Sequence, residues 1–319
     1  MLTLSCDAIS LHNGASSSQK TRFMPTDTFK VLFDVPMLLG ECPLWHPNEA
    51  VLYWIDITGR AVHRFNPSHN THHMWSLPAE PGCIAWCASG GLIVAMRTGV
   101  VLLNTIDGSL TPVADAPYDT SRIRFNDGRC DVAGRLWTGT LYEPRDQQAG
   151  SLFCIEHGTI RDASKSVTVS NGVAFSIDSH TLYHTDTTAH RIMAYQFNPA
   201  TGEIGIGRLF KQFSSNRTNN YGGRPDGAAI DSEGTYWCAM YEGGRLLRLA
   251  PSGEVLREII LPLRCPTMIA FGGPDLKTLY VTSVRDKRPA EELAQYPLSG
   301  CVLTLSVDVP GRPESAYIL

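Results

Sequence analysis

The 319-residue sequence lacks the long apolar segments and the basic clusters that mark several classes of protein. No segment approaches the roughly 18–20 consecutive apolar residues that a membrane-spanning helix needs. The formal net charge is −4, and no basic stripe interrupts the sequence, so nothing indicates binding to nucleic acid or to an anionic membrane. These absences favour a small-molecule partner.

Paired cysteine motifs and a secretory leader are also missing. The nine cysteines are odd in number and show no Cys-x-x-Cys spacing, which indicates neither a complete disulfide framework nor a zinc ribbon. The first ten residues, MLTLSCDAIS, have no basic region and no sustained apolar core, so they make a poor signal peptide. We therefore expect a cytoplasmic protein, monomeric by default, with an N-terminal arm or tail over residues 1–27 and a single domain over residues 28–319.

Common catalytic motifs are absent as well. The sequence has no Gly-x-Ser-x-Gly elbow of a serine hydrolase, no His-Glu-x-x-His zinc motif and no dinucleotide-binding Gly-x-Gly-x-x-Gly between a strand and a helix. Four histidines gather between His63 and His73, around the turn Asn66-Pro67-Ser68. We expect a solvated loop there rather than a metal site.

What the sequence does contain is a repeat. An apolar strand of the type "LYW" or "LWT", bounded by turn residues, recurs six times at intervals of 40 to 54 residues. The six copies are Ala50–Ile57, Gly91–Arg97, Gly134–Thr140, Thr181–Thr187, Gly234–Met240 and Thr278–Ser283. Repeats of this length with several short strands each are typical of propeller blades, and we predict an all-β, six-bladed β-propeller. Two unrelated β-sandwiches are disfavoured because the regular period leaves no place for a domain boundary.

A propeller must also close its ring. Closure by strands from the two chain ends removes the open sheet edge that would otherwise favour aggregation. The segments Phe29–Asp34 and Gly300–Val307 are apolar and strand-like, and we expect them to share the last blade.

Polar residues recur where the innermost strand of each predicted blade begins. In a propeller these starts meet at one mouth of the central channel, and here they are Glu41, Arg124, Asn126, Asp127, Asn171, Asp226 and Thr267. Carboxylate and amide oxygens suit hard or borderline divalent cations such as Ca²⁺, Mg²⁺, Mn²⁺ or Zn²⁺. Asn-Gly and Asp-Gly pairs are also ordinary turn sequences, so each residue taken singly has a purely structural explanation.

Four sequence blocks extend this interpretation. LLGECPLWHPNEAVLYWIDI, RFNDGRCDVAGRLWTGT, SNGVAFSIDSHTLYHTD and RPDGAAIDSEGTYWCAMYEGGRLLRLAPSG resemble the signature blocks of the regucalcin/gluconolactonase family. The resemblance spans about residues 30–307 and implies one divalent cation in the channel and hydrolysis of sugar lactones. It also implies that Glu41, Asn171 and Asp226 are the metal ligands and that Arg124 and Asn126 contact the substrate.

Two positions depart from the family pattern. Animal members carry two consecutive glutamates shortly after the Gly-Thr that ends the second of these blocks, where this chain has Tyr142-Glu143-Pro144, so Glu143 is the candidate for a further substrate contact. Glu-Cys-Pro stands where Glu-Gly-Pro is common, which places Cys42 behind the ligand Glu41. Both departures concern the choice of substrate and leave the three predicted ligands in place.

The sequence thus predicts a metal-dependent hydrolase that opens an aldonolactone, for example gluconolactone or arabinonolactone. The cation would polarise the lactone carbonyl, and Asp226 would serve as general base or position the attacking water. Two alternatives stay open. One is arylesterase or phosphotriesterase activity at the same metal site, and the other is a non-catalytic metal-binding scaffold.

Overall fold

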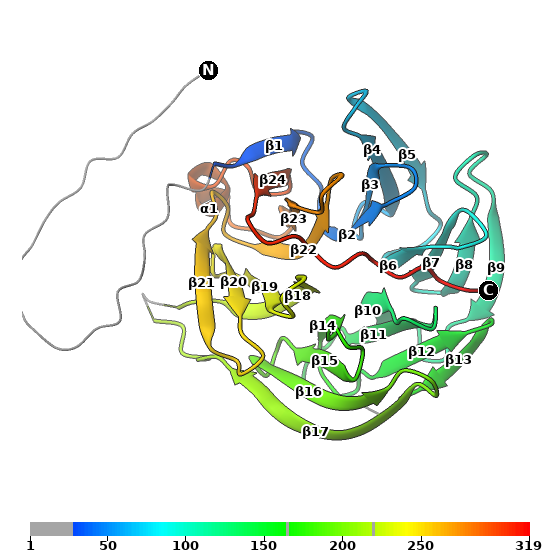
Figure 1. Cartoon of the computed structure of the whole chain (residues 1–319). Coiled ribbons are helices and arrows are strands. Elements are labelled where there is room, and N and C mark those ends of the chain that lie inside the picture. Colours follow the sequence, from blue (N-terminus) through cyan, green and yellow to red (C-terminus); the bar gives the residue numbers. More distant parts are fainter. Residues whose placement is uncertain (1–27, 164–165, 219–220) are drawn as a thin grey trace, which may run out of the picture.

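The structure, a computed structural model, describes residues 28–163, 166–218 and 221–319, and these form six four-stranded antiparallel sheets in a ring (Figure 1). The predicted six-bladed β-propeller is confirmed, whereas the predicted arm over residues 1–27 lies outside the described residues. The innermost strands are β2 (Gly40–His46), β6 (Pro81–Trp86), β10 (Ile123–Cys130), β14 (Ser170–Phe175), β18 (Arg224–Ile230) and β22 (Pro266–Gly272). The second strands are β3 (Val51–Asp56), β7 (Leu92–Met96), β11 (Leu136–Tyr142), β15 (Thr181–Asp186), β19 (Tyr236–Tyr241) and β23 (Thr278–Ser283).

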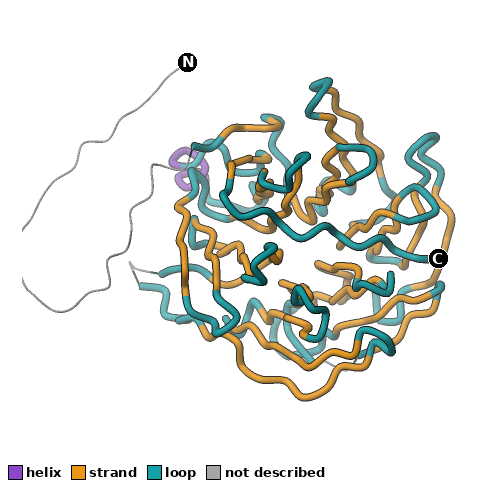
Figure 2. The backbone as a smooth tube through the Cα atoms, in the orientation of Figure 1, coloured by secondary structure: helices purple, strands orange, loops and turns teal. Residues whose placement is uncertain are grey.

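The outer half of each blade is less regular in length. The third strands are β4 (Ala61–Asn66), β8 (Gly99–Leu103), β12 (Leu152–Glu156), β16 (Arg191–Asn198), β20 (Arg245–Leu249) and β24 (Val302–Ser306). The outermost strands are β5 (Thr71–Ser76), β9 (Leu110–Asp115), β13 (Thr159–Asp162), β17 (Glu203–Gln212), β21 (Val255–Ile260) and β1 (Lys30–Phe33). Among the described residues the single α-helix is α1 (Ala290–Gln295), and no helix is long and apolar enough to cross a membrane (Figure 2).

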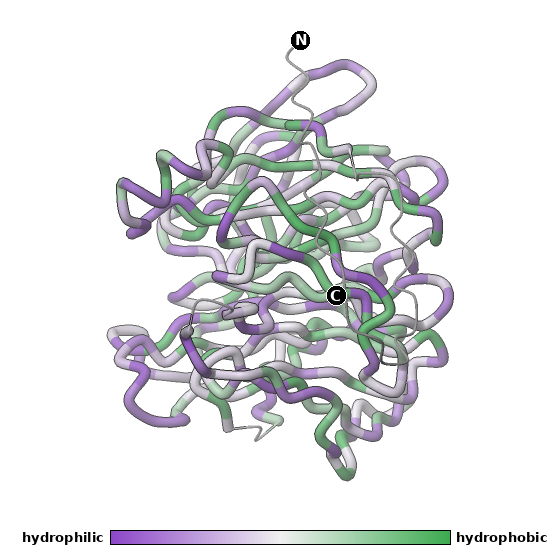
Figure 3. The backbone as a smooth tube through the Cα atoms, turned by 90° about the vertical axis from the view of Figure 1, so that its left-hand side faces the viewer, coloured by the Kyte–Doolittle hydropathy of each residue, from purple (hydrophilic) through white to green (hydrophobic). Residues whose placement is uncertain are grey.

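The six repeated segments of the sequence are the second strands of the blades. These strands are almost completely buried, because the faces of neighbouring blades pack against each other and cover both sides of the sheet. Strands buried on both faces need continuous apolar sequence, which explains the "LYW" phrases. Hydrophobic residues accordingly follow the strands, and hydrophilic residues gather at the projecting turns (Figure 3).

The ring closes as predicted. β1 from the start of the domain pairs antiparallel with β24 from its end, with Lys30 opposite Thr304 and Val31 opposite Leu303. The last blade therefore contains strands from both ends of the propeller, and the innermost strands contact one another in a complete circle from β2 to β22 and back to β2. This circle surrounds the central channel.

In each of two blades, a buried aspartate fixes the hairpin between the first two strands. The Asp231 carboxylate accepts hydrogen bonds from the Thr235 backbone, the Trp237 indole at 2.9 Å and the Arg248 guanidinium at 2.9 Å. Asp131 has the same relation to Trp137, at 2.8 Å. Each aspartate satisfies the polar edge of an otherwise apolar tryptophan, which lets the ring lie in the core.

The C-terminal segment crosses the centre of the ring (Figure 1). Arg312 donates hydrogen bonds to the carbonyls of Phe175 and Ser176, and Tyr317 pairs with the backbone of the second blade through Trp86. Between them, Glu314 forms an ion pair with Arg129, whose guanidinium also donates to carbonyls of blades four and five. This strap therefore covers the end of the channel opposite to the starts of the inner strands.

Candidate active site

An open cavity of about 560 Å³ lies where the inner strands begin. The predicted residues that line it are Glu41, Arg124, Asn126, Asn171, Asp226 and Thr267. These residues come from five different blades and are separated by up to 226 positions in the chain, yet the fold brings them to one surface. The prediction that the strand starts converge at one mouth of the channel is therefore confirmed for these six residues.

A backbone irregularity aims these side chains into the cavity. All six inner strands change register against their neighbours near their first residues, for example between Glu41 and Leu44 and between Asn171 and Ala174. Such bulges redirect a side chain and end the regular pairing. After three of the cavity residues, the next residue in the chain has a positive φ. These next residues are Cys42 at 46°, Asp127 at 35° and Gly172 at 57°.

A positive φ is unfavourable for a residue with a side chain. Gly172 meets this requirement easily, whereas Cys42 adopts the left-handed region despite its side chain. Cys42 is buried behind Glu41, and its thiol lies 3.5 Å from the Ile84 carbonyl of the next blade. The need for a positive φ at this position explains why glycine fits it well.

Arg124, Asn126 and Asn171 form one hydrogen-bonded chain. The Arg124 guanidinium donates to Oδ1 of Asn126 at 2.8 Å, and Nδ2 of Asn126 donates to Oδ1 of Asn171 at 2.8 Å. Nδ2 of Asn171 in turn donates to the Thr187 hydroxyl at 2.9 Å. The chain fixes the orientation of both amides, because each nitrogen has an acceptor and each oxygen a donor.

Glu41 and Asp226 are two buried carboxylates that face the same cavity. Their exposed fractions are 6% and 4%. Burial raises the pKa of both carboxyl groups well above the usual value, and the charge of Asp226 raises the pKa of Glu41 further. Oδ1 of Asp226 is buried without any hydrogen-bond partner among the described residues. Two buried like charges and an unpartnered oxygen are the condition that a bound cation relieves.

The donor set fits an oxygen-preferring cation. Two carboxylates and the Asn171 amide oxygen are hard ligands of the kind that divalent cations such as Ca²⁺ accept. Among the described residues no three His, Cys, Asp or Glu side chains cluster as metal ligands. The Asn171 amide oxygen is one of the neutral oxygen donors that line the cavity beside the two carboxylates.

Asp127 and Glu143 lie outside the cavity wall. The Asp127 carboxylate accepts hydrogen bonds from the backbone nitrogens of Gly128 and Val173, which links the third and fourth blades. Glu143 forms a two-point ion pair with Arg97, at 2.7 and 3.2 Å, with its side chain 41% exposed. Asp127 therefore has a structural role, and the charge of Glu143 acts on Arg124 without entering the cavity.

Sequence reasoning missed further polar residues of the cavity. Arg145, Thr187, Thr188, Arg224 and Tyr241 also line it. Arg145 belongs to the loop after β11, and Arg224 is the first residue of β18, two positions before Asp226. The spacing to Asp226 was the available signal, since residues two apart on a strand face the same side.

Comparison with known proteins gives similarity over most of the chain. Residues 39–285 match the family described as SMP-30/Gluconolactonase/LRE-like region. The chain is 46% identical to the 6-deoxy-6-sulfogluconolactonase of Pseudomonas putida, over 91% of this chain and 99% of the relative. It is 33% identical to a pentonolactonase of Haloferax volcanii, over 88% and 95% of the two chains.

Solved structures show the same architecture. The crystal structure of regucalcin from Agrobacterium tumefaciens, titled a calcium-binding protein, superposes with a TM-score of 0.87 at 29% identity and covers 93% of this chain and 100% of its own. The family match spans well over half of the chain and includes every predicted metal ligand and substrate contact. The chain is therefore a member of the SMP-30/gluconolactonase/LRE-like family.

Proposed function

We propose that this protein is a metal-dependent lactonase that opens a sugar lactone to the corresponding aldonic acid. The observation that carries the proposal is the buried, unpartnered Oδ1 of Asp226, which shares the cavity with Glu41 and Asn171. The lactonase class follows from the family and from relatives named as lactonases. The cavity adds a donor set suited to a cation.

We assign one divalent cation to Glu41, Asn171 and Asp226. When bound, such an ion would polarise a lactone carbonyl and favour ionisation of water at neutral pH. Ca²⁺, Zn²⁺, Mn²⁺ and Mg²⁺ all accept oxygen donors, and the description of the Agrobacterium regucalcin as a calcium-binding protein makes Ca²⁺ the first ion to test.

The chain's own residues supply orientation and proton transfer. Asp226 is proposed as the general base, because its carboxylate lines the cavity and has two oxygens, so that one can contact the cation while the other accepts a proton from an attacking water. Arg124 and Asn126 are proposed to hold the sugar hydroxyls. Burial lowers the pKa of Arg124 to about 10, which still leaves the guanidinium charged at neutral pH, and its chain to Asn171 keeps it in place.

Glu143 remains a proposed substrate contact, acting from the loop beside the cavity. Its carboxylate would have to exchange Arg97 for a substrate hydroxyl. A rise in KM with unchanged kcat for Glu143→Gln would support this contact. An unchanged KM would show that Glu143 does not contact the substrate and only pairs with Arg97.

The relatives narrow the substrate class. One acts by name on a sulfonated six-carbon gluconolactone and the other on pentonolactones. We therefore propose aldonolactones of five or six carbons, with a six-carbon lactone first because the more similar relative uses one. A non-catalytic scaffold is less well supported, since it would not require the open cavity beside the ligand set.

The test is proton release from a panel of pentono- and hexonolactones, with spontaneous hydrolysis subtracted. Metal-stripped protein should be inactive, and one restored ion should recover turnover of at least one lactone. The exposed variant Asp308→Asn serves as a control for handling and should behave as wild type. Turnover that survives complete removal of metal would contradict the proposal, as would the absence of turnover with every ion.

A further inference from the structure

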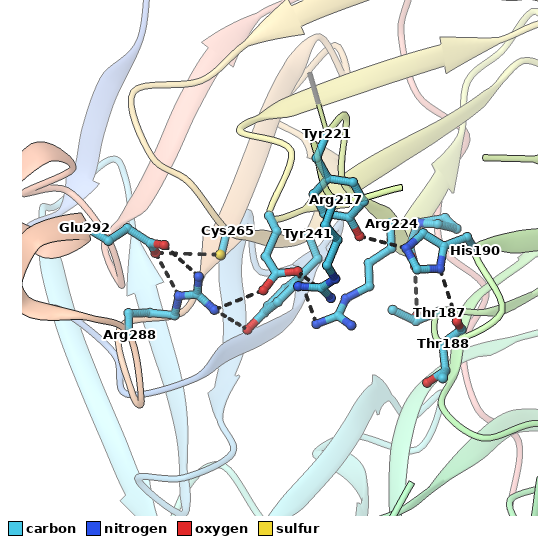
Figure 4. Close-up of polar contacts among 12 residues, drawn as sticks. Thr187, Thr188, His190, Arg217, Tyr221, Arg224, Tyr241, Cys265, Arg288 and Glu292 are labelled. Atoms are coloured by element: carbon cyan, nitrogen blue, oxygen red, sulfur yellow. Dashed lines mark hydrogen bonds and ion pairs between the residues drawn. The ribbon is translucent and has the colours of Figure 1, made fainter. Parts of the chain in front are cut away.

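The cavity rim carries a second set of charged residues that the proposed lactone chemistry does not use. Arg145 and Arg224 line the cavity itself, and Arg217 lies beside Arg224 (Figure 4). Arg224 and Arg217 share one carboxylate, Glu242, at 3.5 and 3.2 Å. The rim on this side is therefore rich in guanidinium groups.

Arg224 is held in place but is not fully satisfied. Its guanidinium lies 5.0 Å from the centre of the Tyr241 ring, and its Nε is buried without a hydrogen-bond partner among the described residues. The 3.5 Å approach to Glu242 is longer than a good charged hydrogen bond. Glu242 is also shared with Arg288 at 3.4 Å, so it does not neutralise Arg224 alone.

Arg145 has even fewer partners. Within the described part of the chain, no hydrogen bond or ion pair engages its guanidinium, although the residue lines the cavity and is otherwise exposed. Arg145, Arg224 and Asp226 all line the same cavity. The two guanidiniums therefore lie on the wall of the cavity that holds the proposed reaction centre.

Neutral groups complete this side of the rim. The His190 ring bonds to the Tyr221 hydroxyl at 2.7 Å and to the Thr188 carbonyl at 3.1 Å (Figure 4). Burial lowers the pKa of His190, and the charges of Arg224 and Arg217 lower it further. At neutral pH the ring is therefore uncharged, and it fixes the segment that presents Thr188 to the cavity.

We infer that Arg145 and Arg224 form a subsite for a tetrahedral oxyanion, a sulfonate or a phosphate, at the end of the sugar lactone remote from its carbonyl. This inference rests on the proposed function and specifies its substrate class. A planar guanidinium binds such an anion through two parallel hydrogen bonds, which lysine cannot reproduce. With a cation balancing Glu41 and Asp226, the single carboxylate of Glu242 contacts both Arg217 and Arg224, so it does not neutralise both guanidiniums.

The position of Arg224 fits this substrate orientation. Arg224 and Asp226 are two residues apart on β18, a separation of roughly 7 Å along an extended strand, and both face the cavity. A lactone carbonyl beside Asp226 leaves the exocyclic carbon of a hexonolactone directed towards the rim. A charged group on that carbon would then lie near Arg224.

The experiment compares kcat/KM of the metal-loaded protein for D-gluconolactone, 6-phosphogluconolactone and 6-deoxy-6-sulfogluconolactone. Wild type should prefer at least one charged lactone by about 10- to 100-fold, the range expected for hydrogen bonds to charged groups. Arg145→Ala and Arg224→Ala should each remove most of this preference, so that kcat/KM falls much more for the charged lactones than for D-gluconolactone. Arg145→Lys and Arg224→Lys should recover only part of it, and Arg208→Ala, on exposed β17, should have no effect.

Binding provides a readout that does not depend on turnover. Calorimetry with 6-phosphogluconate and with gluconate should show tighter binding of the charged acid to wild type, and this difference should be lost in Arg224→Ala. The ratio between the phosphate and sulfonate arms identifies which anion the subsite prefers. Equal use of neutral and charged lactones by wild type, or equal losses for all three in the arginine variants, would overturn the subsite and leave the lactonase assignment standing. Failure to open any of the lactones with any ion would overturn both.

Discussion

The side-chain amide of Asn126 donates a 2.8 Å hydrogen bond to Oδ1 of Asn171. This bond joins a proposed substrate contact on the third blade to a proposed metal ligand on the fourth. It leaves one lone pair of the Asn171 oxygen for a cation and directs it, because the nitrogen of the same amide is held by Thr187. If the proposed assignments hold, this hydrogen bond couples substrate binding to metal binding.

The first prediction follows from this bond. Asn126→Ala removes the donor to Asn171 and the acceptor of Arg124, and partners of this kind usually change metal affinity by about 10- to 100-fold. We expect weaker metal binding by calorimetry together with lower kcat/KM for a lactone. Asn48→Ala, on an exposed turn, is the matched control and should leave both quantities unchanged. Loss of turnover with wild-type metal affinity would show that Asn126 acts on the substrate alone.

A second prediction concerns stability without metal. Glu41 and Asp226 are buried together and raise each other's cost of ionisation, so metal-free protein should gain stability when one charge is removed. Asp226→Asn should melt a few degrees above wild type in the presence of a chelator, at about 2–4 °C per kcal/mol. Added metal should raise the Tm of wild type and have a smaller effect on the variant. A lower Tm for metal-free Asp226→Asn would contradict the proposed repulsion.

A third prediction concerns acid stability through Asp231. Burial raises the pKa of this carboxyl, but hydrogen bonds from Thr235 and Trp237 and the charge of Arg248 outweigh it, so the pKa lies below its usual value. The stabilisation is therefore complete above the unfolded pKa of about 3.9 and is lost as the pH falls through the folded pKa. Asp231→Asn should cost about 2–4 kcal/mol at pH 7 in urea denaturation.

The difference in free energy of unfolding between Asp231→Asn and wild type should become smaller as the pH is lowered below about 4. The reason is that Asp231 of the wild type then loses its charge as well. Asp308→Asn, which changes an exposed carboxylate, should show no such narrowing. A constant difference between pH 3 and pH 7 would rule out a charge-dependent role for Asp231.

A fourth prediction concerns the C-terminal strap. Burial by itself would lower the pKa of the Arg129 guanidinium. The negative charge of Glu314 outweighs burial, so the pKa is raised. Glu314→Gln leaves a buried guanidinium without its partner and should destabilise the protein by about 3–5 kcal/mol. Double replacement with Arg129→Met should recover part of this loss. Lactone turnover at low temperature should stay near the wild-type value, since the strap covers the end of the channel away from the cavity.

Much of the fold was predictable because one structural unit is repeated six times. Each second strand is covered on both faces and therefore needs a similar apolar sequence, and the recurrence of this sequence reveals the repeat length. The convergence of Glu41, Asn171 and Asp226 followed from their equivalent positions in the repeat. A repeat with closed symmetry turns equal sequence position into spatial proximity.

Other features follow from contacts that have no periodic signal. Arg145 resembles a solvated surface charge in the sequence, and only the path of the loop after β11 brings it to the cavity. The solvated loop expected over the histidine-rich stretch is wrong for His63, which lies buried on β4 with its ring stacked on Trp54. The local sequence around histidines on paired strands does not show which ring is stacked in the core and which is exposed.

The most direct test of the central claim is lactone turnover by Asp226→Asn under conditions in which metal binding is verified independently. The asparagine amide still offers an oxygen to a cation but cannot accept the proton of an attacking water at neutral pH. We expect kcat to fall by about 100-fold or more, a loss in the range of general-base catalysis, while calorimetry still detects a bound ion at saturating metal. Near-wild-type kcat with metal bound would contradict the role of Asp226 and, with it, the proposed mechanism.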